Sequence, residues 1–504
     1  MEEALSNFWS KITSRMEPAV FFGSAFVVIL FCIFGGFFTD TSASVFEAAQ
    51  KWVSTNLGGY YMVITSGFLL FTLWLGLGPF RKVKLGPPDS KPDYSTLSWL
   101  CMLFSAGMGV GIVFWGVAEP ISHFTDPPFA QAESQAAVGE AMRYSFFHWG
   151  LHPWAIYIIL GVSLAYFHFR HKLPLAPRAI LYPIFGRKVM EGPVGHAVDI
   201  LCVVGTLLGV STSLGLGAMQ VNSGVSSFSD IPTDKITQIS LIGIITAIAT
   251  VSVVVGLKQG IRRLSQFNLI MTVVLLLFVF VMGPTWFILE LMSTSIVEYF
   301  QFLPQMSLFD SFEEESDWQA TWTYYYWGWW ISWSPFVGIF IARISKGRTI
   351  GEFVFYVLLL PSLFTFFWFA TFGGTALHAQ MNGSEIAQVV DENVGFSLHA
   401  LLQDLPLASI TLVWATLAIM VFFITSSDSG SFVDDMVTSG GHPNPAKPQR
   451  VFWAVSEGAV AATLLLVGGL SAIQNASISM GAVMSLVLVL ACFALVKSLR
   501  RDQK

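Results

Sequence analysis

Aromatic residues are the side chains of this sequence whose type and spacing most suggest chemistry. Residues 324–335 read YYYWGWWISWSP. On a helix, at 100° per residue, Trp329, Trp330 and Trp333 lie within about 100° of one another. Trp and Tyr in membrane proteins usually occupy the water–lipid interface, and we expect this for Trp327 and the three tyrosines before it. A single tight aromatic face followed by Ser-Pro is less typical of an interface.

A second aromatic segment, residues 148–157, reads HWGLHPWAIY. On a continuous helix Trp149, Trp154 and Tyr157 fall within about 140°. Tryptophan faces that converge in a dry site form an aromatic cage, which attracts quaternary ammonium groups by about 0.5–2 kcal/mol per contact. Neither aromatic segment contains Asp or Glu, so a bare organic cation would stay uncompensated. The pattern therefore favours a zwitterion of the betaine type over free choline.

Three glycines at alternate positions follow Ser105 in the sequence SAGMGVG. Gly107, Gly109 and Gly111 each cost a helix roughly 1 kcal/mol relative to Ala, so the segment around Met108 favours a locally unwound helix. Secondary transporters bind substrates and ions at such broken helices. Close helix packing through small residues explains the glycines equally well, and both interpretations stay open.

Hydroxyl groups cluster in the sequence TSSDSGS at 425–431, shortly after Phe422. A hard cation such as sodium takes oxygen ligands, which Thr425 and Ser426 could supply. Helix capping by Ser and Thr accounts for the cluster as well. The two interpretations carry equal weight.

The elements that position these residues are expected to be membrane spans. Of the 504 residues, 54% are apolar and only 12% charged, whereas soluble domains carry about 25% charge. A water-soluble fold is excluded, and an all-α integral membrane protein with twelve transmembrane helices is expected. We place the spans near 19–38, 60–80, 95–116, 148–168, 196–221, 238–256, 267–289, 322–342, 351–377, 405–427, 450–470 and 475–496. Four cysteines, Cys32, Cys101, Cys202 and Cys492, fall inside these apolar runs and are expected to be small buried side chains without disulfides.

Basic residues fix the expected orientation. With twelve spans, 23 of the 26 lysines and arginines fall on the side of the two termini, leaving only Lys51, Arg143 and Lys235 on the other. Cytoplasmic loops collect such residues, so both termini are expected in the cytoplasm of a bacterium, with the protein in its inner membrane. The opposite loops are acidic, mainly 310–317 and 385–404, which is typical of a solvated surface. Nothing suggests nucleic-acid binding.

Five segments together resemble the betaine/choline/carnitine transporter family. They are GMGVG at 107–111, FWGVAEP at 114–120, HWGLHPWAIY at 148–157, WGWWISWSPFVGIFIARISKGRT at 327–349 and TSSDSGS at 425–431. The resemblance implies a LeuT-like fold of two inverted five-helix repeats preceded by two additional helices, assembled as a homotrimer. The implied organisation is a short cytoplasmic tail (1–18), two peripheral helices (19–94), a first repeat of spans 3–7 (95–290), an exterior acidic connector (291–321), a second repeat of spans 8–12 (322–496) and a short cytoplasmic tail (497–504).

The resemblance also implies which residues bind substrate and ions. The implied substrate site comprises Trp149, Trp154, Tyr157, Trp329, Trp330, Trp333, Met108, Gly109 and Gly111. The implied sodium site comprises Ser105, Met108 and Phe422 through their backbone and Thr425 and Ser426 through their hydroxyls. A second sodium site near Thr206 is doubtful, because Val210 stands where sodium-coupled members tend to keep a second Thr. Proton-coupled choline members tend to carry Asp in place of Gly111, and sodium-independent carnitine exchangers Arg where Asn268 aligns; this chain has neither.

The sequence therefore predicts a secondary active transporter that imports a betaine-type solute with sodium by alternating access, without a cofactor. The alternative is a proton-coupled or exchange carrier for choline or carnitine. A polytopic membrane enzyme is a distant alternative, since it would need clustered His, Asp or Glu at membrane depth; His148 and His152 share a helix face, but no metal partner is evident nearby. Long charged tails, which osmosensing members carry, are not expected. The choice among glycine betaine, choline, carnitine, ectoine and dimethylsulfoniopropionate stays open.

Overall fold

The protein is helical along nearly its whole length. The computed structural model describes residues 15–107, 109–255, 258–308, 318–442 and 445–503. The helices are α2 (Pro18–Phe37), α3 (Thr39–Leu77), α4 (Thr96–Gly107), α5 (Val110–Thr125), α6 (Gln135–Trp149), α7 (Leu151–His171), η1 (Pro177–Leu181), α8 (Tyr182–Phe185), α9 (Arg187–Met190), α10 (Pro193–Ser226), α11 (Lys235–Val255), α12 (Lys258–Met282), α13 (Thr285–Leu308), α14 (Trp318–Thr321), α15 (Thr323–Ile344), α16 (Ile350–Met381), α17 (Ile386–Glu392), η2 (Val394–Phe396), α18 (Ser397–Gln403), α19 (Ala408–Val437), α20 (Lys447–Gly468) and α21 (Leu470–Asp502).

Eight helical stretches within the described ranges are long and apolar enough to cross a membrane. They are α2, α3, α6 with α7, α10, α16, α19, α20 and α21, and a bent pair formed by α12 and α13 brings the number to nine. Large apolar side chains cover the outside, for example Phe22 and Phe26 of α2, which are both more than half exposed. An exterior of this kind suits lipid rather than water. The chain is a multi-pass integral membrane protein, and the number twelve stays a prediction.

Several expected spans differ from the helices in length, and three of them show why. The second begins at Thr39 instead of residue 60, because the polar sequence before residue 60 contains no proline and continues the helix. The tenth continues ten residues past 427, to Val437. The seventh was expected to run to 289, but α12 ends at Met282 and α13 leaves it at 106°. Gly283 and Pro284 separate these two helices, and proline disfavours helical geometry in the residue before it.

The third span is interrupted, which is one of the two interpretations that the glycine run left open. Helix α4 ends at Gly107 and α5 begins at Val110. Between them Gly109 has extended backbone, with φ −124° and ψ −162°. Met108 lies outside the described residues. The glycine pattern therefore does interrupt this helix.

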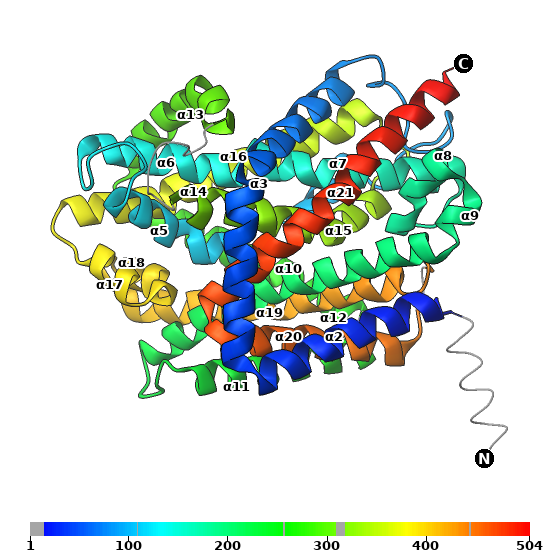
Figure 1. Cartoon of the computed structure of the whole chain (residues 1–504). Helices are drawn as coiled ribbons and strands as arrows, with labels where there is room; N and C mark the ends of the chain where they lie inside the picture. Colours follow the sequence, from blue (N-terminus) through cyan, green and yellow to red (C-terminus); the bar gives the residue numbers. More distant parts are fainter. Residues whose placement is uncertain (1–14, 108, 256–257, 309–317, 443–444, 504) are drawn as a thin grey trace.

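Helix α15 lies at the centre of the bundle, with α7, α10 and α21 packed around it (Figure 1). Glycines allow the close approach. A Cβ at Gly338 of α15 would lie 3.0 Å from Leu160 Cβ and 3.3 Å from the backbone nitrogen of Gly161 on α7. On another side of α15, a Cβ at Gly328 would overlap the backbone of Ile478 on α21. Small residues at such crossings let the backbones touch, so the aromatic side chains of α15 are held between its neighbours.

The cysteine prediction is correct in one respect and wrong in another. All four cysteines are free. Only Cys202 is buried, whereas Cys101 is exposed and Cys32 and Cys492 are partly exposed. An apolar run at the outside of a membrane protein faces lipid, so its small residues need not be covered by protein. The acidic loop 310–317 lies outside the described residues. Trp318, the residue that follows it, begins α14.

Candidate substrate and ion site

The aromatic residues expected to form a cage lie against one another. Trp149 at the end of α6 meets Trp330 of α15 with ring centroids 4.9 Å apart at 73°. Trp329 and Trp330 stack at 4.5 Å. Tyr157 of α7 lies 6.4 Å from Trp330 and 6.0 Å from Trp333, and Trp154 lies 5.5 Å from Tyr157. We call these six residues the aromatic cluster; all are buried. The tertiary structure thus brings the predicted residues of two segments, far apart in sequence, into one dry site.

The helix geometry assumed for the segment 148–157 is wrong in one detail. Trp149 ends α6, and α7 begins at Leu151. Gly150 between them has φ −94° and ψ −125°, which is not helical. An added Cβ there would meet the carbonyl oxygen of Phe146. Trp149 therefore does not share an uninterrupted helix with Trp154 and Tyr157.

The glycine segment of the third span borders the aromatic cluster. A Cβ at Gly111 would lie 2.6 Å from Trp329 Cη2 and 3.2 Å from Trp149 Cη2. A Cβ at Gly109 would lie 3.8 Å from Trp333 Cη2 and 3.7 Å from Ser426 Oγ. The helix break, the tryptophans of α15 and the hydroxyl group of α19 therefore meet at one place.

The hydroxyl residues of α19 lie inside the helix. The capping interpretation is wrong, since α19 continues to Val437. Thr425 Oγ1 donates to the carbonyl oxygens of Val421, at 3.0 Å, and Phe422, at 3.1 Å. Phe422 O and Thr425 Oγ1 thus lie side by side, and Ser426 lies next to Gly109. Of these oxygens, the hydroxyl of Ser426 is the one that lies beside the helix break.

Two other predicted ion-site residues are only partly placed. Ser105 belongs to the last turn of α4, and the structure describes no more than its backbone. Thr206 is buried in α10. Its helix touches the aromatic cluster further along, since a Cβ at Gly209 would lie 3.0 Å from Trp333 Cδ1. No contact joins Thr206 itself to the described part of the site, so its role stays a prediction.

Sequence reasoning missed the carboxylate of Glu119. It was expected that the cluster would have no acidic partner, yet Glu119 Oε2 accepts a hydrogen bond of 2.7 Å from Trp149 Nε1. The same oxygen accepts from the hydroxyl of Tyr326. Glu119 Oε1 lies 2.7 Å from His148 Nδ1 and 3.2 Å from His123 Nε2. A charged residue inside an apolar span is itself a signal of function, and this signal was present in the segment FWGVAEP.

The same cluster corrects the statement that His148 has no metal partners nearby. Ligand atoms of Glu119, His123 and His148 all lie within 4.8 Å of one another. His148 Nε2 also lies 3.0 Å from Thr323 Oγ1. These atoms are bound to each other through hydrogen bonds, so they form a network that holds one edge of Trp149. Glu119 and His123 lie one turn apart on α5, whereas His148 of α6 joins them only in the fold.

The expected interfacial position of Trp327 and the preceding tyrosines is wrong. Trp327, Tyr325 and Tyr326 are fully buried, and Tyr324 nearly so. Trp327 stacks on His152 with centroids 5.2 Å apart at 25°. Because α15 is surrounded by other helices, none of its faces reaches the membrane interface at this point.

Comparisons with known proteins show the family of this chain. Residues 19–504 match the model of the betaine/carnitine/choline family transporters. The chain belongs to this family. Its relatives include the glycine betaine transporter OpuD of Bacillus subtilis, 45% identical over 469 residues, which cover 92% of this chain and 91% of OpuD. A glycine betaine/proline/choline transporter of Vibrio parahaemolyticus is 41% identical over 503 residues, covering 96% and 90%. The osmo-dependent choline transporter BetT2 of Acinetobacter baylyi is 37% identical, covering 97% and 72%. Members of the family are transporters, and the enzyme alternative is excluded.

Proposed function

We propose that this family member imports a zwitterionic quaternary-ammonium solute of the glycine betaine type together with sodium. The observation that supports this proposal is the meeting of the aromatic cluster, the helix break at Gly109 and the hydroxyl of Ser426. Three or four ring faces at about 0.5–2 kcal/mol each provide useful binding energy for a methylated ammonium group. Bare carbonyls at a helix break and nearby hydroxyls suit a sodium ion.

The position of Glu119 favours a zwitterion over a bare cation as substrate. Its carboxylate binds the indole N–H of Trp149, while Cη2 at the opposite edge of that ring faces Gly111 and Trp329. The oxygens of Glu119 are further engaged by His148 and a tyrosine hydroxyl. Glu119 is therefore a positioning residue behind the ring. A substrate that carries its own carboxylate needs no such charge from the protein.

The proposed mechanism is alternating access in a LeuT-like arrangement. Spans 3–7 and 8–12 of twelve would form the two inverted repeats, both termini would lie in the cytoplasm of a bacterial cell, and three copies would assemble in its inner membrane. A sodium ion that crosses roughly 150 mV gains about 3.5 kcal/mol. By the relation of tenfold per 1.4 kcal/mol, this supports a several-hundredfold accumulation of substrate.

The coupling is tested with purified protein in proteoliposomes. Uptake of labelled glycine betaine should be faster with an inward sodium gradient than with potassium at the same membrane potential. Ser426→Ala should weaken the sodium dependence. Ser429→Ala is the matched control, since its hydroxyl donates to the carbonyl of Thr425 at 2.9 Å within the same helix. Equal uptake in sodium and potassium would reject sodium coupling.

The aromatic site is tested separately from the ion. Trp330→Leu removes a ring that contacts both Trp149 and Trp329, and glycine betaine affinity should fall by several-fold or more. Trp453→Leu is the control, because Trp453 is equally buried but bonds to Thr438 outside the cluster. Both variants should lose stability, and only the first should lose affinity. Unchanged affinity of Trp330→Leu would reject the cage.

The second candidate is a proton-coupled or exchange carrier for choline or carnitine. The buried network of Glu119, His123 and His148 is the observation in its favour, because ionisable groups inside membranes can carry protons. Counterflow of labelled choline or carnitine without sodium would distinguish this carrier from the sodium symporter.

A further inference from the structure

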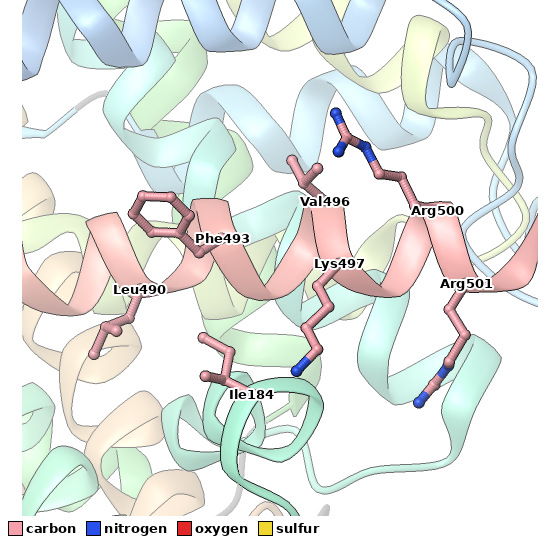
Figure 2. A pocket seen from close by; sticks show the side chains of 7 residues that line it. All are labelled: Ile184, Leu490, Phe493, Val496, Lys497, Arg500 and Arg501. Carbon is pink, nitrogen blue, oxygen red and sulfur yellow. The ribbon is translucent and has the colours of Figure 1, made fainter.

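A pocket lies between the C-terminal helix α21 and the short helix α8, away from the aromatic cluster. Its volume is about 680 Å³. Its lining consists of Ile184 on α8 and of Leu490, Phe493, Val496, Lys497, Arg500 and Arg501 on α21. Figure 2 shows that Lys497 and Arg501 extend to the side of α21 on which Ile184 lies, while Arg500 extends to the other side. The pocket therefore combines an apolar wall with two cations that point the same way.

The apolar wall continues along α21 toward the membrane interior. Leu486, Leu490, Phe493 and Lys497 follow one another at spacings of three or four residues, so they share one helix face. Leu486 is 60% exposed and Phe493 67% exposed. At 1.5 Å per residue, the distance from Leu486 to Lys497 is roughly 16 Å, close to the thickness of one hydrocarbon leaflet, about 15 Å. An apolar face of this length that ends in cations has the dimensions of one lipid chain with its headgroup.

The acidic residue nearest in sequence to these cations is largely engaged elsewhere. Asp502 bonds to Tyr166 at 2.6 Å, His171 at 3.0 Å and Arg170 at 3.4 Å, all on α7. Its contact with Arg501 is longer, at 3.8 Å. Lys497 forms no ion pair with any residue that the structure describes. The positive charge at the pocket is therefore left largely uncompensated by the protein.

We infer that this pocket binds an anionic phospholipid, with the phosphate between Lys497 and Arg501 and one acyl chain along Leu486, Leu490 and Phe493. Basic pockets at the ends of membrane helices attract anionic headgroups by about 1 kcal/mol per cation. A second copy of this chain that met this face with the same face would bring its own cations to the same place. An anionic lipid satisfies both halves of the pocket. The inference depends on the membrane location and on neither the substrate nor the coupling ion.

The test measures binding of spin-labelled phosphatidylglycerol to the purified full-length protein in detergent, with spin-labelled phosphatidylcholine as the neutral probe. The double variant Lys497→Gln with Arg501→Gln should bind phosphatidylglycerol about 30-fold more weakly, which corresponds to about 2 kcal/mol. Phosphatidylcholine binding should change little. Arg81→Gln with Lys82→Gln is the matched control, because both of these residues are exposed and basic but lie in the loop after α3; it should bind both lipids like the wild type.

A third variant tests the apolar half of the pocket. Leu490→Trp fills the wall without changing charge and should also weaken phosphatidylglycerol binding. Inorganic phosphate, which has no acyl chain, should fail to displace the lipid. An equal loss in the Arg81 and Lys82 control would show non-specific surface attraction and overturn the inference. Unchanged lipid binding together with a changed assembly size would assign the pocket to contacts between copies and overturn it as well.

Discussion

Gly111→Ala adds a single methyl group where two tryptophans of the aromatic cluster meet the third span. The new Cβ would lie 2.6 Å from Trp329 Cη2 and 3.2 Å from Trp149 Cη2, whereas carbon atoms prefer about 3.5–4.0 Å. Trp329 cannot easily retreat. It stacks on Tyr325 at 5.6 Å and on Trp330 at 4.5 Å, and its Nε1 donates to the carbonyl of Gly209 at 3.3 Å.

The expected magnitude follows from the cost of overpacking. Inserting a methyl group into a well-packed core costs about 1–3 kcal/mol. If the displaced rings are those that hold the substrate, glycine betaine affinity should fall by about 5-fold to 140-fold, at tenfold per 1.4 kcal/mol. The loss in folding stability should be smaller, because Ala is favoured over Gly in a helix by up to about 1 kcal/mol.

Gly109→Ala provides a control two residues away. Its Cβ would meet only ordinary contacts, at 3.7 and 3.8 Å, and its φ of −124° is accessible to Ala. Glycine betaine binding would be followed by the change in intrinsic tryptophan fluorescence, and stability by thermal unfolding in the same detergent. Equal affinities of the Gly111→Ala and Gly109→Ala variants would refute the reasoning, because only the first places a methyl group against the rings.

Three further predictions concern a hydrogen bond of the aromatic cluster, a buried ion pair and a glycine with open space around it. In a double-mutant cycle, Glu119→Gln and Trp149→Phe should each weaken glycine betaine binding. Their effects on the binding free energy should be coupled by at least about 0.5 kcal/mol, because Glu119 acts through the indole N–H of Trp149. Strictly additive effects would contradict this role. Asp199→Ala should lower the free energy of unfolding by about 1–3 kcal/mol, because the backbone N–H of buried Arg178 loses its acceptor, Asp199 Oδ1 at 2.8 Å, while Glu17 stays as a carboxylate partner of the guanidinium at 2.9 Å; thermal unfolding measures this, and a loss below about 0.5 kcal/mol would contradict it. Gly243→Ala, whose Cβ meets nothing within 4 Å, should leave substrate affinity unchanged and should not lower the melting temperature.

Much of the fold was predictable because its signals are local. Apolar length and charge marked membrane helices, and the helices α2, α16, α20 and α21 lie where such runs were placed. The glycine run left a helix break and close helix packing open, and the structure shows a break before Val110. Helix ends were less predictable: the polar start of α3 and the end of α19 continue helices beyond their apolar parts, where hydropathy gives no signal.

The candidate site was predictable in its residue types and only partly in its environment. The aromatic residues were identified from their spacing, and their burial together agrees with a cage. The position of Tyr326 was misjudged, because a sequence cannot show whether an aromatic helix lies at the centre or at the edge of a bundle. Ser426 was selected as an oxygen ligand, and its approach to Gly109 comes from two helices that are distant in the chain.

The sequence by itself determined that this protein crosses a membrane, where a glycine run weakens a helix, and which aromatic residues could share a face, because composition and spacing act over a few residues. Only the tertiary structure decided what surrounds those rings. Glu119 reaches Trp149 from 30 residues away and Tyr326 from 207 residues away, and Trp149 of α6 meets Trp330 of α15 only where these segments pack together. Such contacts depend on how whole helices cross, and crossing is set by close packing between segments that no local pattern connects.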